Sequence, residues 1–277
     1  MRARSTGYKR RARARMALLE DIRQNGATFV VFSLFATVAL AIFVHSLLTA
    51  HWQRAFMGVL TLLLLLIPTL VERSFALRLP CTLEILAYGF VFAAGVLGEI
   101  AGFYERFGFW DDMLHGCNGF MFAAFGFCLV GLTQRKVGRR ARCAPLLVAL
   151  IAFCFSMTVG VFWELFEYST DAVLGTDMQK DTLLYAIHTV SLSAAGEGTV
   201  HLRDVTETVI RTAGGEEIVI AGYLDVGLAD TMLDLFVNAI GALVFCMIGY
   251  VYLQGASGRL ARQFIPEVLD KKAKNKG

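Results

Sequence analysis

Long apolar runs separated by short polar segments dominate the sequence. Four of these runs, at residues 27–50, 113–133, 144–163 and 235–258, contain no Asp, Glu, Lys or Arg and at most one His each. Two others are shorter or bounded by acidic residues, at 55–71 and 83–104, and Pro68 predicts a kink near the end of the first of these. Since about 20 apolar residues form a helix long enough to cross a bilayer, the pattern predicts an all-α polytopic membrane protein with six transmembrane helices.

Composition supports the membrane class. Hydrophobic residues make up 56% of the 277 positions and charged residues only 18%, against roughly 45–50% and about 25% in ordinary soluble domains. The six cysteines are scattered singly, without a CxxC pair. We therefore expect neither a disulfide framework nor a zinc knuckle.

The distribution of basic residues predicts the orientation of the helices. If the N-terminus is cytoplasmic, the cytoplasmic segments hold 21 of the 26 Lys and Arg residues, as the positive-inside rule requires. We therefore expect a bacterial cytoplasmic (inner) membrane protein with a basic N-terminal segment (1–26), a membrane domain (27–258) and a basic tail (259–277), both termini being cytoplasmic. The basic N-terminus is interpreted as a topology anchor attracted to anionic lipid, with no nucleic-acid partner. The first apolar run is too long for a cleavable signal peptide.

The long polar segment at 164–231 is predicted to be an extracytoplasmic loop. Within it, residues 182–196 are uncharged but too few for a seventh span, which favours an interfacial or re-entrant piece. Two β-branched runs, VTETVIRT and EIVIAGYL, flank the glycine-containing turn AGGE. This pattern predicts a small β-hairpin cap at 205–223, between the fifth and sixth transmembrane helices.

Ionisable residues recur at one depth of the membrane. Glu99, His115, Glu164 and Asp234 each lie 18 to 25 residues from the nearest predicted cytoplasmic end. At 1.5 Å per helical residue this is about 27–37 Å, which is the outer boundary of the bilayer. Several helices are therefore expected to carry polar side chains in one plane.

Helical spacing places these polar residues in stripes, because residues three or four apart share a helix face. Ionisable groups at membrane depth cost about 2.5–3.5 kcal/mol each on insertion scales and tend to face the helix bundle. Together the stripes predict a candidate divalent-metal site. Its residues are Asp111 and His115; Glu164, Glu167 and Asp171; and Asp230, Asp234 and Asn238.

Two other interpretations of the stripes stay open. Shared protons could neutralise converging carboxylates as well as a cation could. Alternatively, the acidic residues are simply the ends of helices at the water boundary. If a metal binds, oxygen donors suit Mg²⁺, Mn²⁺ or Ca²⁺, and His115 would also allow Zn²⁺ or Fe²⁺. Small residues at Gly116, Gly119, Gly160 and Gly241 would let the helices approach closely.

Three segments resemble the YjdF-like family of bacterial polytopic membrane proteins, whose function is unknown. They are WDDMLHGCNGFM, FWELFEYSTDAVLGTDMQ and GYLDVGLADTMLDLFVNAIGAL, and the resemblance covers roughly residues 80–253. A weaker similarity is to VanZ-like proteins, through a D-x-x-x-N-x-x-G run at Asp234, Asn238 and Gly241. There Glu167 stands where a VanZ-like protein has Gln, and the similarity implies an envelope-related role.

Three functions are compatible with the sequence. The first is a divalent-metal site acting on a phosphate-bearing lipid or envelope precursor. The second is a cation or proton transporter using the same carboxylates, for which few polar residues lie deeper than Asn238. The third is a non-catalytic envelope assembly or stress protein. The sequence contains no GxSxG, HExxH or P-loop motif, and nothing in it nominates a covalent nucleophile. Catalytic residues, the substrate and the oligomeric state are therefore left unassigned.

Overall fold

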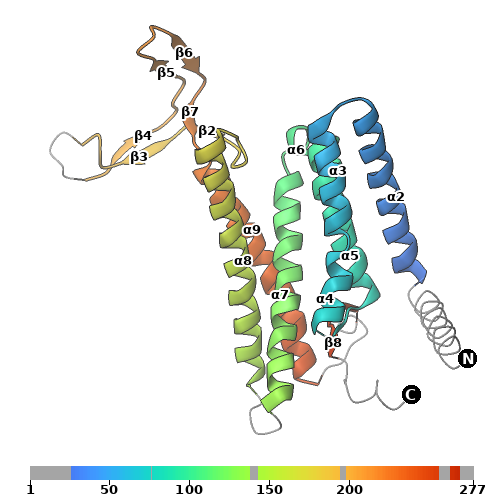
Figure 1. Ribbon diagram of the computed structural model, residues 1–277. Coiled ribbons are helices and arrows are strands. Elements are labelled where there is room, and N and C mark those ends of the chain that lie inside the picture. The colour runs from blue at the N-terminus through green and yellow to red at the C-terminus, as the bar shows by residue number, and fades with distance from the viewer. Residues whose placement is uncertain (1–25, 76, 138–142, 194–197, 256–262, 269–277) are drawn as a thin grey trace, which may run out of the picture. The chain divides into compact units, whose positions relative to one another are not determined.

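The computed structural model describes residues 26–75, 77–137, 143–193, 198–255 and 263–268. Six helical segments in this part of the chain are long and apolar enough to cross a membrane: Gly26–Leu48, Trp52–Phe75, Cys81–Ile100, Trp110–Gln134, Pro145–Leu174 and Leu228–Leu253. They confirm the six predicted helices (Figure 1). Most of the basic N-terminal segment and of the basic tail lies outside the described residues, and so does the basic loop at 138–142.

The second and third spans are interrupted helices. The second consists of α3 (Trp52–Leu64) and α4 (Ile67–Phe75), which are separated by a turn just before Pro68. Proline lacks an N–H and fits only the first turn of a helix, so the break occurs slightly earlier than the predicted kink. The third span begins as α5 (Cys81–Phe92) and continues as a π-helix, η1 (Ala93–Ile100). A short helix, α6 (Phe103–Arg106), follows after Gly102, which is left-handed at φ 71°.

The other long helices are continuous. They are α2 (Gly26–Leu48), α7 (Trp110–Val137), α8 (Pro145–Leu174) and α9 (Leu228–Leu253). α8 extends eleven residues beyond the apolar run that predicted it and ends at Leu174; the next residue, Gly175, has a φ of 64° that suits a residue without a side chain. α9 begins seven residues before its predicted start. The polar stripes at 164–171 and 230–238 are therefore helical throughout.

The chain between α8 and α9 forms short antiparallel strand pairs. The predicted hairpin is confirmed as β5 (Thr208–Arg211) paired with β6 (Glu217–Ile220). β2 (Thr182–Leu184) pairs with β7 (Tyr223–Asp225), and β3 (Ile187–Thr189) with β4 (Val200–Leu202). Within the uncharged stretch predicted as an interfacial or re-entrant piece at 182–196, residues 182–184 and 187–189 are thus strands, and residues 194–196 lie outside the described residues. Elsewhere β1 (Leu77–Arg78) pairs with β8 (Glu267–Val268).

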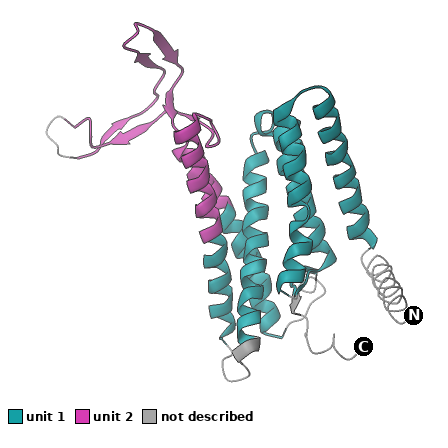
Figure 2. Ribbon diagram, viewed as in Figure 1, with its two compact units in different colours: residues 1–157, 238–277 teal, residues 158–237 magenta. Residues whose placement is uncertain are grey.

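The chain divides into two compact units (Figure 2). The first comprises residues 1–157 and 238–277, and the second comprises residues 158–237. We call them the helical unit and the outer unit, the second name referring only to the extracytoplasmic position that the sequence predicts for residues 164–231. The unit boundary falls inside α8 and inside α9, both of which run through it without interruption.

Small residues let helices of the helical unit pack closely. α7, α8 and α9 supply most of its buried core, in which alanines at 123, 124, 149, 152 and 242 are prominent. A Cβ atom built on Gly119 of α7 would overlap the carbonyl oxygen of Asn238, and one built on Gly241 of α9 would overlap that of Gly116. The two backbones therefore meet directly, as small-residue interfaces allow in membranes.

This backbone contact predicts that Gly119→Ala and Gly241→Ala destabilise the protein. Each added methyl group must push two main chains apart, and overpacking of this kind costs about 1–3 kcal/mol. Thermal unfolding of the detergent-purified variants should show a lower Tm. Gly89→Ala is the matched control, because a Cβ there meets nothing within 4 Å. An unchanged Tm for both interface variants would contradict the close contact.

Candidate functional site

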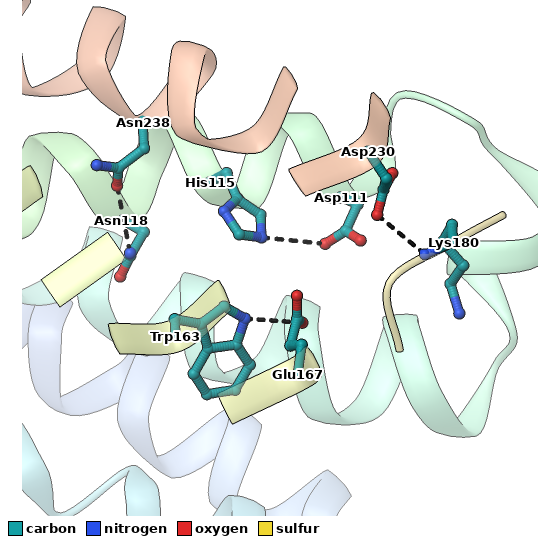
Figure 3. Close-up of polar contacts among 8 residues, drawn as sticks. All are labelled: Asp111, His115, Asn118, Trp163, Glu167, Lys180, Asp230 and Asn238. Carbon is teal, nitrogen blue, oxygen red and sulfur yellow. Dashed lines mark hydrogen bonds and ion pairs between the residues drawn. The ribbon is translucent and has the colours of Figure 1, made fainter. Parts of the chain in front are cut away.

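Three helices of the helical unit meet around Gly119. Ser156 of α8 donates a hydrogen bond from Oγ to the carbonyl oxygen of Gly119 over 2.7 Å. Asn238 of α9 accepts one at Oδ1 from Nδ2 of Asn118 over 3.4 Å (Figure 3), and its own Nδ2 contacts the sulfur of Met157 at 3.5 Å. Ser156 and Asn238 are both 0% exposed. Asn238 is therefore satisfied within this junction and acts as a helix-packing residue.

His115 and Asp111 extend the same face of α7 toward its N-terminus. His115 precedes Gly119 by one turn and is buried, and its Nε2 lies 3.7 Å from Oδ1 of Asp111 (Figure 3). α7 begins at Trp110, so Asp111 occupies the first turn, where the helix dipole favours a carboxylate. The predicted i, i+4 pair is thus formed within the helical unit.

The C-terminal part of α8 carries two buried carboxylates. Glu164 and Glu167 are 5% and 6% exposed, although they are among the most polar residue types. Oε1 of Glu167 accepts a hydrogen bond of 2.8 Å from the indole N–H of Trp163, which fixes the direction of this carboxylate (Figure 3). Both residues belong to the outer unit.

The N-terminal part of α9 contributes Asp234 and Asp230 to the same unit. Asp234 is 1% exposed, and Asp230 lies one turn before it. Oδ2 of Asp230 accepts a hydrogen bond of 3.0 Å from the backbone N–H of Lys180 (Figure 3). Asp225 caps the start of the helix by accepting from the backbone N–H of Ala229 at 2.6 Å. Asp230 and Asp225 thus hold the chain that enters α9.

Asp171 organises the loop that follows α8. Its Oδ1 accepts hydrogen bonds from the hydroxyl of Thr176 and the backbone N–H of Met178, both at 2.7 Å, and its Oδ2 accepts from the N–H of Gln179 at 2.8 Å. Both oxygens are therefore engaged by the loop. The spacing of Asp171 placed it correctly on the α8 stripe, but sequence alone did not reveal these backbone partners, which lie up to eight residues away.

An acidic cavity lies beside this loop in the outer unit. It has a volume of about 340 Å³, and its lining includes Asp171, Asp177 and Asp181. Partial desolvation, together with repulsion from Asp177, Asp225 and Asp171, raises the pKa of Asp181 above its ordinary value. The cavity is a second acidic region, separate from the buried carboxylates of α8 and α9.

The polar residues that sequence reasoning selected thus fall into two classes. Asp171, Asp230 and Asn238 have identified structural partners, which are loop or strand-linking backbone groups for the first two and Asn118 for the third. Glu164, Glu167, Asp234 and His115 are ionisable side chains that are each more than nine-tenths buried; Glu167 accepts the Trp163 hydrogen bond, and Asp111 lies beside His115. What distinguishes this second class is the burial of ionisable groups, which makes its members the ligand candidates considered below.

Comparison with known proteins identifies the class of protein. The family described as "Predicted membrane protein (DUF2238)" matches residues 29–255. An "Uncharacterized protein" of Thermotoga maritima is 30% identical over 107 residues, which are 39% of this chain. The match spans about half of that relative, 53% of its length. No solved structure matches the chain. These findings agree with the expected membership of a membrane-protein family of unknown function.

The hydrogen bonds of Asp171 predict a local effect of its removal. In Asp171→Ala the loop loses three acceptor contacts, each worth about 0.5–1.5 kcal/mol, so the backbone amides of Met178 and Gln179 should exchange with deuterium about tenfold faster or more. Hydrogen–deuterium exchange with mass spectrometry measures this. Asp177→Ala, in the same loop, is the control, because the Asp177 side chain does not bond these two amides. Equal exchange in the two variants would refute the assignment.

Proposed function

The chain belongs to the family of predicted membrane proteins described as DUF2238, and from this premise we propose that it binds a divalent cation at one boundary of the membrane. The proposed ligands are His115, Glu164, Glu167 and Asp234, with Asp111 beside His115. The observation that carries the proposal is the burial of four ionisable side chains at corresponding ends of three membrane-spanning helices.

The continuity of α8 and α9 supports the choice of ligands. Ser156 and Asn238 direct one face of each helix at Gly119 of α7. On α8, Gly160, Glu164 and Glu167 follow Ser156 by 4, 8 and 11 residues, and on α9, Asp234 precedes Asn238 by 4. Residues at these spacings lie on one helix face. His115 precedes Gly119 by the same single turn on α7, which makes it the proposed nitrogen ligand.

Charge supplies the reason for a cation. Three carboxylates removed from water raise one another's free energy and cannot all stay ionised without compensation. In a low-dielectric surrounding a divalent cation compensates them directly, and oxygen donors with one imidazole are common ligands of Mn²⁺, Zn²⁺ and Fe²⁺. Asp171 and Asp230 are left out of the ligand set because they are only partly buried and because loop amides bond both oxygens of Asp171 and Oδ2 of Asp230. Asn238 is left out because it is engaged with Asn118 and Met157.

A phosphate-bearing lipid or envelope precursor is the proposed substrate. When bound, the cation would act as a Lewis acid on a phosphate oxygen. The support for this class of substrate is chemical: carboxylate-held divalent cations at a membrane boundary are suited to phosphate groups that lie at the same depth.

We also propose that the protein lies in the bacterial cytoplasmic membrane with both termini cytoplasmic. The support is the concentration of Lys and Arg in the segments at one end of the helices. In this orientation the outer unit and the proposed metal site are extracytoplasmic.

The metal proposal predicts a near-stoichiometric divalent ion in the purified protein. Elemental mass spectrometry should detect it in the wild type, after purification or after reloading with Mn²⁺ or Zn²⁺. The double variant Glu167→Gln plus Asp234→Asn should bind at least tenfold less tightly, because it loses two charged ligands. Chelator should lower the Tm of the wild type and leave the double variant unchanged.

A matched double variant controls for nonspecific charge effects. Asp177→Asn plus Glu207→Gln makes the same two chemical changes at exposed positions and should retain the ion. Failure of the wild type to bind Mn²⁺ or Zn²⁺, together with a Tm insensitive to chelator, would overturn the proposal. Equal metal loss in both double variants would overturn the ligand assignment.

A further inference from the structure

We propose that a cavity at the membrane boundary of the helical unit binds the phosphoethanolamine headgroup of a membrane lipid. The cavity has a volume of about 210 Å³ and is lined by Gln53, Arg54, Met57, Glu99 and Ile100. It lies between the N-terminal turn of α3 and the C-terminal turn of η1. Pockets for drug-sized ligands span about 300–1,000 Å³, so this cavity suits a headgroup rather than a larger molecule.

Two opposite charges line the cavity without pairing with each other. Among the described residues, neither Arg54 nor Glu99 forms an ion pair or a side-chain hydrogen bond. Both side chains are exposed to the cavity and its opening. A ligand with one negative and one positive group could pair with both residues at once, its negative group with Arg54 of α3 and its positive group with Glu99 of η1.

The α3 side of the cavity is suited to a phosphate. Arg54 offers a planar fork of N–H donors that matches phosphate oxygens, and the Gln53 amide adds another donor. Both residues occupy the first turn of α3, and His51 at the N-cap makes no side-chain capping bond there. The N-terminal end of this 13-residue helix therefore adds a favourable dipole and backbone donors to the charge of Arg54.

The η1 side of the cavity is suited to an ammonium group. Glu99 is the acidic residue there, and it lies in a π-helix in which the N–H of Ala101 bonds to the carbonyl of Val96 at 3.0 Å. The wider i→i+5 turn rotates the residues that follow away from the positions of an α-helix. π-helical turns occur frequently at functional sites. Here Glu99 belongs to the π-helix itself and lines the same cavity as Arg54 of α3.

Neighbouring side chains place the cavity at the level of lipid headgroups. Trp52 and Phe56, on the same end of α3, are 69% and 64% exposed. Exposed aromatic residues at the ends of membrane helices lie at the interface with water. Met57 and Ile100 supply an apolar edge for the start of the lipid chains. Phosphatidylethanolamine combines all the required groups, and its primary ammonium can donate hydrogen bonds to Glu99, unlike the trimethylammonium of phosphatidylcholine.

Lipid titration of the full-length protein tests the proposal. Detergent-solubilised protein would be titrated with phosphatidylethanolamine, phosphatidylcholine or phosphatidylglycerol, and bound lipid would be counted by native mass spectrometry. We expect phosphatidylethanolamine to bind about tenfold more tightly than the other two. Arg54→Gln and Glu99→Gln should each weaken its binding about tenfold or more, because each removes one charge-assisted interaction. Arg54→Lys should retain part of the affinity, and the control Arg106→Gln should retain all of it.

Soluble glycerophosphoethanolamine distinguishes the source of the headgroup. If it competes with the lipid, the headgroup alone is recognised; if it does not, the apolar edge at Met57 and Ile100 is also required, and both results support the site. Equal binding of phosphatidylethanolamine and phosphatidylcholine would overturn the proposal. So would Arg54→Gln and Glu99→Gln proteins that bind phosphatidylethanolamine as the wild type does. Because neither residue belongs to the proposed metal site, the outcome is independent of metal binding.

Discussion

Removal of ionisable side chains from water is the constraint on which the interpretation of this protein depends. Four ionisable side chains, His115, Glu164, Glu167 and Asp234, are buried in this protein. The helices that carry them expose many large apolar side chains. Burial of an isolated charge is costly in any protein, because the surroundings that replace water solvate a charge poorly. Side chains of this kind are retained where something specific compensates them. Gly119 and Gly241 each pack against the backbone of the opposing helix. This packing brings α7 and α9 together at the level of Asn238.

The lengths of the apolar runs predicted the six helices, because a helix needs about 20 apolar residues to cross the bilayer. The ends of the runs, however, did not coincide with the ends of the helices. α8 continues to Leu174 because nothing between Trp163 and Gly175 breaks a helix, even though the sequence becomes polar. The hairpin of β5 and β6 was predictable from β-branched runs around a short turn. The pairing of β2 with β7 was not, because it joins two three-residue strands some forty residues apart. The π-helix η1 has no established sequence signature.

The candidate site was predictable in part, because helical spacing shows which residues share a helix face. Helical spacing selected the residues that lie on one face of α7, α8 and α9, and the structure keeps them on continuous helices. Spacing could not separate ligand candidates from structural residues. Asp171 and Asp230 bind backbone N–H groups of the loop at 178–180, and loop geometry of this kind depends on tertiary folding rather than on local pattern. The charged cavity at Arg54 and Glu99 joins residues from separate helices and was also not predicted.

The most direct measurement of the central claim is pulsed electron paramagnetic resonance of Mn²⁺ added to protein whose histidines carry ¹⁵N. This method detects magnetic coupling between the metal and a directly bound imidazole nitrogen. The account predicts one such nitrogen in the wild type and its loss in His115→Gln, with retention in His188→Gln, which alters an exposed strand residue. Bound Mn²⁺ without nitrogen coupling, or coupling that persists in His115→Gln, would contradict a site built around His115 and the carboxylates of α8 and α9.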